Sequence, residues 1–300
     1  MDDTGTQTLN HLPIPRQEVA ASTRWMEWGG WLLIGSGLVH LIIYATQDGS
    51  WEGPVSWRKP ILFGLSTGMT MLSMAWIWPR LKPARYDGWL IPTISFGLVF
   101  EVALITVQQW RGVASHFNHE TLLDQTFDLI ITVFVTLAAL AIFDLTRRSW
   151  RSFDATPDIR LAVRWGMNFL SVSCLIGFWM LWFGGRQMAA GNDPGLVGNA
   201  GVAKFPHGVT IHSIQFLPLL CWILWRFGFE DSTRRSAVAW VIGSMALLLL
   251  FSIMQTAAGR SRFDLTLSSG LVLAAGMALL VPVGITVLRQ VFAKQAAQTS

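Results

Sequence analysis

Charged residues, tyrosine and cysteine are all scarce in this 300-residue chain. Only 13% of its residues are charged, whereas a soluble domain carries roughly 25%. The two cysteines, Cys174 and Cys221, lie deep inside apolar runs, so we expect small core residues there and not a disulfide. The motif C-x-x-C-H is absent, which excludes covalently attached c-type haem.

The signature motifs of several protein classes are missing as well. The chain has no G-x-x-x-x-G-K-[ST], no G-x-G-x-x-G after a strand, no H-E-x-x-H and no G-x-S-x-G. No lysine lies in the middle of an apolar run, which argues against a retinal Schiff base, and no arginine ladder indicates a voltage sensor. Nothing in the sequence favours nucleic-acid binding.

Apolar runs near the length of a bilayer crossing, about 20 residues, are abundant. Hydrophobic residues make up 52% of the chain, and its mean hydropathy is +0.45. A β-barrel would show alternating segments of about 10 residues instead, so we predict an all-α integral membrane protein. Eight spans are expected, none clearly interrupted in its middle, at residues 28–46, 61–79, 89–110, 127–146, 164–184, 208–227, 237–257 and 266–288.

The lysines and arginines predict how these spans are oriented. Most of the 22 lie on one side, which the positive-inside rule makes cytoplasmic. Both termini should therefore be cytoplasmic in a plasma membrane, that of a bacterium being the inner membrane. The first 26 residues lack a basic-then-apolar pattern, so we expect no cleaved signal peptide. The outer side holds Arg58, Lys59, Arg111, Arg186, Lys204, Arg260 and Arg262.

A motif at the end of the third span recurs at the end of the seventh. The segment Q-W-R-G-V-A-S-H-F-N begins at Gln109, and Q-T-A-A-G-R-S-R-F-D begins at Gln255, with Pro60 and Pro206 at the same spacing. We predict a tandem duplication of two four-helix units, related by a pseudo-two-fold axis along the membrane normal. The expected parts are a cytoplasmic N-terminal tail at 1–26, repeats at 27–150 and 151–290, and a cytoplasmic C-terminal tail at 291–300.

Several polar residues lie inside the outer parts of the spans. From the rise of 1.5 Å per residue, His40 should lie about 9 Å deep, His212 about 6 Å and Glu101 about 13 Å. A charge that faces lipid at the centre costs about 2.5–3.5 kcal/mol, so these side chains should face the bundle. Histidine is a common metal and haem ligand, and His40 and His212 are the predicted metal ligands. His207 and His212 are five residues apart and could not share one ion from a regular helix.

The basic residues on the outer side predict a site for an anion, such as haem propionates, a lipid phosphate or a carboxylate. Simple anchoring at the interface is the alternative, and the glutamines could instead bond across helices. We predict cofactor binding by Arg58, Lys59, Arg111, Lys204, His207, Gln255 and Arg260. Proton transfer or catalysis is predicted for Glu101, Gln109 and His116.

Three functions remain open. The first is a membrane redox protein that binds b-type haem or a quinone on the outer side. The second is a transporter for a small anionic solute, since repeats often line a pathway. The third is a non-catalytic subunit or assembly factor, with a membrane-complex partner or a second copy packed on its many small residues. A duplicated four-span bundle with outer histidines resembles the haem A synthases in topology, and no residue is carried over from that family.

Overall fold

The computed structural model describes residues 17–299. Within them, eight helical segments are long and apolar enough to cross a membrane, which confirms the all-helical membrane class and the eight spans. Residues 1–16 of the predicted N-terminal tail, Arg16 among them, and Ser300 lie outside the described part. The chain divides into two compact units, unit 1 up to Ala155 and unit 2 from Thr156. The duplication and its symmetry axis stay predictions.

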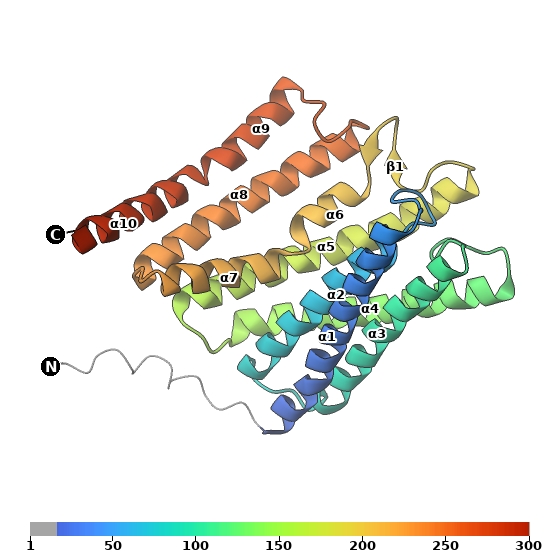
Figure 1. The fold of residues 1–300 in the computed structure, drawn as a ribbon, viewed down its shortest axis with the longest axis horizontal. Coiled ribbons are helices and arrows are strands. Elements are labelled where there is room, and N and C mark those ends of the chain that lie inside the picture. Colours follow the sequence, from blue (N-terminus) through green and yellow to red (C-terminus); the bar gives the residue numbers. More distant parts are fainter. Residues whose placement is uncertain (1–16, 300) are drawn as a thin grey trace. The chain divides into compact units, whose positions relative to one another are not determined.

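Unit 1 contains four long helices, shown from blue to green in Figure 1. We call their ends outer and inner after the predicted orientation. Glycines bring the first two helices into contact: a Cβ at Gly68 would lie 2.6 Å from the Gly30 carbonyl oxygen, and one at Gly64 2.8 Å from that of Leu33. Such close packing through small residues is typical of membrane helices. The elements are α1 (Gln17–Thr46), α2 (Arg58–Ile77), the 3₁₀ turn η1 (Trp78–Arg80), α3 (Asp87–Trp110) and α4 (Leu122–Arg151).

A buried ion pair holds the inner end of unit 1. Both terminal nitrogens of the Arg148 guanidinium donate to Asp87, each at 2.8 Å, and Nη2 also donates to the Lys82 carbonyl oxygen at 2.8 Å. A two-pronged arginine–carboxylate pair of this kind fixes both partners in orientation. It therefore ties the end of α4 to the start of α3.

Unit 2 differs from expectation because two of its spans are interrupted, as Figure 1 shows for α6 and α7. Ile211 and His212 separate α6 from α7, and the Ser213 hydroxyl donates to the Thr210 carbonyl at 2.7 Å, in competition with the helix backbone. Leu279 and Leu280 separate α9 from α10 ahead of Pro282, which has no amide hydrogen. The elements are α5 (Pro157–Ala189), β1 (Leu196–Val197), β2 (Gly201–Val202), α6 (Lys204–Thr210), α7 (Ser213–Arg226), α8 (Asp231–Ala257), α9 (Leu267–Ala278) and α10 (Val281–Thr299).

The glycine-rich stretch of unit 2 forms a small antiparallel hairpin of β1 and β2. It packs on the end of α8, where the Ala200 amide donates to the Gly259 carbonyl at 3.0 Å. A Cβ at Gly201 would lie only 2.5 Å from the Thr256 carbonyl oxygen. Only glycine allows the hairpin to approach the helix end so closely.

Candidate functional site

The richest polar site lies at the outer end of unit 1, where the α3–α4 loop meets the start of α2. α3 ends at Trp110, and Gly112, just beyond the C-cap Arg111, has a positive φ of 71° that lets the Val113 amide donate back to the Gln108 carbonyl at 3.1 Å. α4 begins with the Thr121 hydroxyl accepting from the Asp124 amide at 3.1 Å. These two caps position the loop. The side chains that it gathers, which we call the outer cluster, are Lys59, Gln108, Arg111, Ser115, His116 and Asp124.

The first half of the outer cluster is an ion pair supported by an amide. Arg111 donates to Asp124 Oδ1 at 2.7 Å and also to Gln108 Oε1. The Gln108 amide donates to the same Asp124 oxygen at 2.9 Å, and the Thr121 hydroxyl donates to the other oxygen. Asp124 is buried and Arg111 is one-third exposed. The Arg111 charge is therefore neutralised by Asp124 within the protein. Arg111 is not free to bind an anionic ligand.

The second half of the outer cluster is a chain of three polar side chains. Lys59 Nζ donates to Ser115 Oγ at 3.1 Å, and Ser115 Oγ lies 2.9 Å from His116 Nδ1. Burial, helped by the nearby Lys59 charge, lowers the pKa of His116 to about 4, so the ring is neutral at pH 7. In the described part of the chain, no carboxylate lies within ion-pair distance of Lys59. This half-buried cation is thus the one in the cluster that keeps an uncompensated charge.

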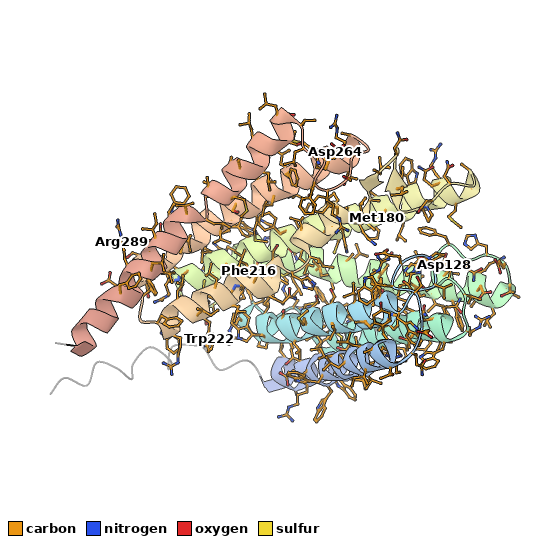
Figure 2. The ribbon with its side chains drawn as sticks, turned by 45° about the horizontal axis from the view of Figure 1, so that its top comes forward. Asp128, Met180, Phe216, Trp222, Asp264 and Arg289 are labelled. Carbon is orange, nitrogen blue, oxygen red and sulfur yellow. The ribbon has the colours of Figure 1, made fainter. Side chains whose placement is uncertain are left out.

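Asp128 holds the loop beyond His116 in a strained conformation. Its Oδ1 accepts from the Phe117 amide at 3.1 Å, and Phe117 has a positive φ of 58°, which is uncommon for a bulky residue. Its Oδ2 lies 3.3 Å from His119 Nε2, and Figure 2 labels Asp128 near the start of α4. Strain of this kind persists only where the surroundings impose it. The cluster is therefore preorganised.

His40 belongs to an aromatic group beside the outer cluster. Its Nδ1 lies 2.8 Å from the Ser36 carbonyl oxygen, and its Nε2 accepts from the Trp110 indole at 3.1 Å. The rings of Trp57 and Trp110 meet edge to face, 5.1 Å apart. Both ring nitrogens of His40 are thus engaged within the protein. Metal ligation by this side chain would require the Trp110 hydrogen bond to break.

Glu101 is buried deeper in unit 1 and is only 4% exposed. Its Oε2 has no hydrogen-bond partner. Seven residues separate Glu101 from Gln108, so both lie on the same face of α3, about 10 Å apart along the axis. The Oε1 atom of Gln109 is also buried without a partner. Orphaned buried polar atoms are costly and rare, which makes Glu101 a candidate for proton handling and Gln109 a candidate for hydrogen bonding to a ligand.

The other predicted residues lie in different surroundings. In unit 1, Arg58 forms an ion pair with the exposed Glu52 at 2.7 Å. In unit 2, His207 Nδ1 lies 2.9 Å from Ser173 Oγ, and His212 precedes α7 with a buried Nδ1 that lacks a partner. Lys204 is exposed at the start of α6, Arg260 lies 3.6 Å from Asp264, and Gln255 donates to the Ser261 and Asp264 carbonyls at 3.0 and 2.9 Å.

Asp124 and Ser115 belong to the outer cluster, although neither residue was predicted from the sequence. Asp124 was placed before the fourth span, because that span was expected to begin at residue 127. The pattern Thr121-Leu-Leu-Asp124 is a helix-start signal, a capping threonine followed three residues later by an acceptor. It would have placed Asp124 in the first turn of α4. Ser115 has no comparable signal in the sequence.

The chain matches no protein-family model, and neither a curated protein nor a solved structure is significantly similar to it. Among residues 17–299, no group of three or more His, Cys, Asp or Glu side chains is arranged to hold a metal ion. The outer cluster itself is therefore the feature of the molecule that bears most directly on function.

Proposed function

We propose that this multi-pass membrane protein is a redox protein that binds a quinone head group at the outer end of unit 1. The observation that carries the proposal is the half-buried Lys59 ammonium group, which donates to the Ser115 hydroxyl and has no carboxylate beside it. A partly buried cation without a counter-charge favours a ligand with electron-rich oxygens. The carbonyl oxygens of a quinone meet this requirement.

The neighbours of Lys59 suit such a ligand. An ammonium group has three N–H donors, so two remain for a carbonyl oxygen after the Ser115 bond. The Phe63 ring lies 6.0 Å from that of His116 and adds an apolar wall. A bound quinone would supply reversible two-electron chemistry. His116 is neutral and can hydrogen-bond to the quinone, while the Glu101 carboxyl offers a proton-handling group deeper in the bundle.

Haem b, the other predicted cofactor, fits the described residues less well. Haem iron takes an uncommitted histidine nitrogen, but His40 uses both of its ring nitrogens. His212 keeps an unpartnered Nδ1, although it belongs to the other unit. A dithionite-reduced absorption spectrum of the purified protein tests the haem hypothesis directly, since a Soret band with sharp α and β bands would establish it.

Quinone binding is tested with purified protein in lipid nanodiscs and a short-chain quinone, by isothermal titration calorimetry. Replacement of Lys59 by methionine should weaken binding about tenfold, the loss of about 1.4 kcal/mol that one charge-assisted bond supplies. Lys59→Arg keeps the charge and should recover most of the affinity. The matched control is Arg186→Met, because Arg186 is also on the predicted outer side but lies over the Trp182 ring in unit 2.

Equal affinity in the Lys59→Met and Arg186→Met proteins would contradict the assigned site. Absence of any heat of binding in the unchanged protein would contradict quinone binding altogether. Folding of each variant is checked by its thermal unfolding temperature before titration.

A transporter for a small anionic solute is the second candidate, and the interrupted spans of unit 2 favour it. Many transporters bind their substrates where membrane helices are discontinuous. The break before α7 places His212, with its unpartnered nitrogen, at such a point. Proteoliposomes should then accumulate a labelled carboxylate, and His212→Ala should reduce the rate. A failure to accumulate any carboxylate or phosphate would remove this candidate.

The role of a non-catalytic subunit stays a prediction, with one observation in its favour. The span Leu267–Arg289 is the least buried of the eight, with 6% of its most apolar window inside the structure. Such a helix leaves an apolar face for lipid or for a partner. Purification of the protein as a lone, monodisperse monomer would count against this role.

A further inference from the structure

A cavity of about 340 Å³ lies between α8 and α10 in unit 2. Ser232, Ser236 and Trp240 line it from α8, and Pro282 and Thr286 line it from α10. The cavity lies where α8 begins and α10 runs towards the chain end, which is the predicted inner side. No function discussed above uses these residues.

The break between α9 and α10 explains why the cavity exists. Before the break, α9 packs tightly on α8, because a Cβ at Gly276 would lie 3.3 Å from the Leu247 side chain. At the break, Leu279 still reaches α8, and its Cδ1 would lie 3.1 Å from a Cβ at Gly243. The Pro282 ring cannot continue the regular helix from α9. A new helix, α10, therefore begins at Val281. The cavity opens beyond that residue.

The polarity of the cavity changes along its length. Ser232, Ser236 and Trp240 follow one another at intervals of four residues, so they form a stripe down one face of α8. On α10, Pro282, Thr286 and Arg289 share a face at intervals of four and three. The exposed Arg289, labelled in Figure 2, lies at the inner end of that stripe. Within the cavity, hydroxyls are followed by an indole and apolar side chains towards the membrane interior, and Arg289 lies just beyond the lining residues, at the inner end of the same face of α10.

The hydroxyl groups are available to a ligand. Within the described part of the chain, Ser232, Thr233 and Ser236 donate to no other residue and can donate to a phosphate, whereas the Thr286 hydroxyl already donates to the Pro282 carbonyl at 2.8 Å. The nearby Asp231 carboxylate accepts from Arg234, which compensates its charge. No carboxylate is among the residues that line the cavity.

We propose that this cavity binds one phospholipid of the inner leaflet that carries an anionic head group. Arg289 and the serine and threonine hydroxyls contact the phosphate and the glycerol oxygens. Trp240 and the apolar wall contact the start of the acyl chains. Arginine forms strong charge-assisted bonds with phosphate, and basic residues at the cytoplasmic surface favour anionic lipids by about 1 kcal/mol each.

Native mass spectrometry of the whole protein tests the proposal after incubation with equal amounts of phosphatidylglycerol and phosphatidylcholine. We expect one phosphatidylglycerol to be retained in preference to phosphatidylcholine. Arg289→Gln should reduce that preference about fivefold, the equivalent of about 1 kcal/mol, and Ser236→Trp should abolish retention by filling the cavity. Arg235→Gln, at the same end of α8 but not among the residues that line the cavity, is the matched control and should retain the lipid.

Equal retention of the two lipids, or equal loss in the Arg289→Gln and Arg235→Gln proteins, would overturn the proposal. A control with inorganic phosphate distinguishes a lipid head group from a free phosphate ion as the ligand. If phosphate alone, added to protein in phosphatidylcholine nanodiscs, raises the unfolding temperature as much as phosphatidylglycerol does, the cavity takes a soluble anion and the lipid assignment is wrong. Arg289 is exposed, so its variant decides the outcome even if Ser236→Trp fails to fold.

Discussion

At the outer end of each unit, a long helix is followed by a glycine with positive φ and a short loop, and the next helix begins at a threonine. The glycines are Gly112 in unit 1 and Gly259 in unit 2, and the threonines are Thr121 and Thr266. Unit 1 closes its loop with charges, through Arg111, Asp124 and Lys59. Unit 2 closes the corresponding loop without a buried charge: a buried glutamine donates to backbone carbonyls, a Thr–Ser capping box starts the next helix, and the Arg260–Asp264 ion pair, at 3.6 Å, is exposed.

Gln108 and Gln255 show which residues of the two loops correspond to each other. The Val113 amide donates to the Gln108 carbonyl, and the Arg260 amide donates to the Gln255 carbonyl. The counterpart of Gln255 is therefore Gln108, one residue before the Gln109 that the sequence motif aligns with it. Counted from the threonine caps, the counterpart of Asp124 is Ser269.

The difference between the two loops bears on the role of the charged residues in unit 1. Because unit 2 closes the same kind of connection with only an exposed ion pair, the buried Asp124 and the half-buried Lys59 are not required for loop closure as such. Buried or half-buried ionic groups are costly, and unit 1 nevertheless contains several at one end. The cost is consistent with a ligand-binding role, and the following experiments test how far the two ends differ.

The largest effect is expected from Asp124→Ala. This change leaves Arg111, Gln108 and the Thr121 hydroxyl without their shared acceptor, and should lower the free energy of unfolding by about 3 kcal/mol. Ser269→Ala, at the matching position of unit 2, removes only a neutral cap and should cost about 1 kcal/mol. Reversible unfolding in mixed detergent micelles measures both. Equal losses of unfolding free energy in the two variants would show that Asp124 stabilises unit 1 no more than a neutral helix cap does.

A smaller effect, about 2 kcal/mol, is expected from Gly201→Ala in unit 2. The new Cβ would meet the Thr256 and Val197 carbonyl oxygens at 2.5 and 2.7 Å, and such overpacking costs about 1–3 kcal/mol. Gly208→Ala has no atom within 4 Å of the new Cβ, so it should be neutral or slightly stabilising in the same unfolding assay. A tolerated Gly201→Ala would mean that the hairpin does not hold the end of α8.

The stability of unit 1 should depend on pH through His116. Its pKa is about 4 in the folded protein and 6.5 ordinarily, so below pH 6.5 the unfolded chain binds more protons than the folded one. Stability is therefore complete above pH 6.5 and falls towards pH 4, by at most about 1.4 kcal/mol per pH unit. His116→Gln should remove this slope, and the slope is measured by denaturation at pH 5.0, 6.0 and 7.0. An unchanged slope would assign it to another group.

The smallest effect is expected from Trp110→Phe, which keeps the ring but removes the donor to His40. Loss of one hydrogen bond should cost about 1 kcal/mol. Trp182→Phe, at an exposed position of unit 2, should leave the free energy of unfolding unchanged in the same measurement. If Trp110→Phe leaves it unchanged too, the His40–Trp110 bond does not contribute to the stability of the outer end.

The membrane class and the eight spans could be predicted from the sequence because hydrophobicity is a local property. An apolar run of about 20 residues has few alternatives to a membrane helix, whatever the rest of the chain does. The burial of His40 and Glu101 could be predicted for the same reason, since lipid penalises exposed polar groups. The interruption before α10 had a local signal in Pro282, whereas the one before α7 depends on a hydroxyl that competes for a single carbonyl.

The partners of the polar groups were decided by the tertiary structure. Nothing local distinguishes Arg111, which is neutralised by Asp124, from Lys59, which is not. Whether His40 has a free nitrogen depends on Trp110, 70 residues away in the chain. A hydrogen bond requires its atoms to be placed within a few tenths of an ångström, and only the packed helices set positions that finely. The apolar pattern of the sequence thus determined which segments are helices and where polar groups are buried, while the fold decided which charges remain available for a ligand.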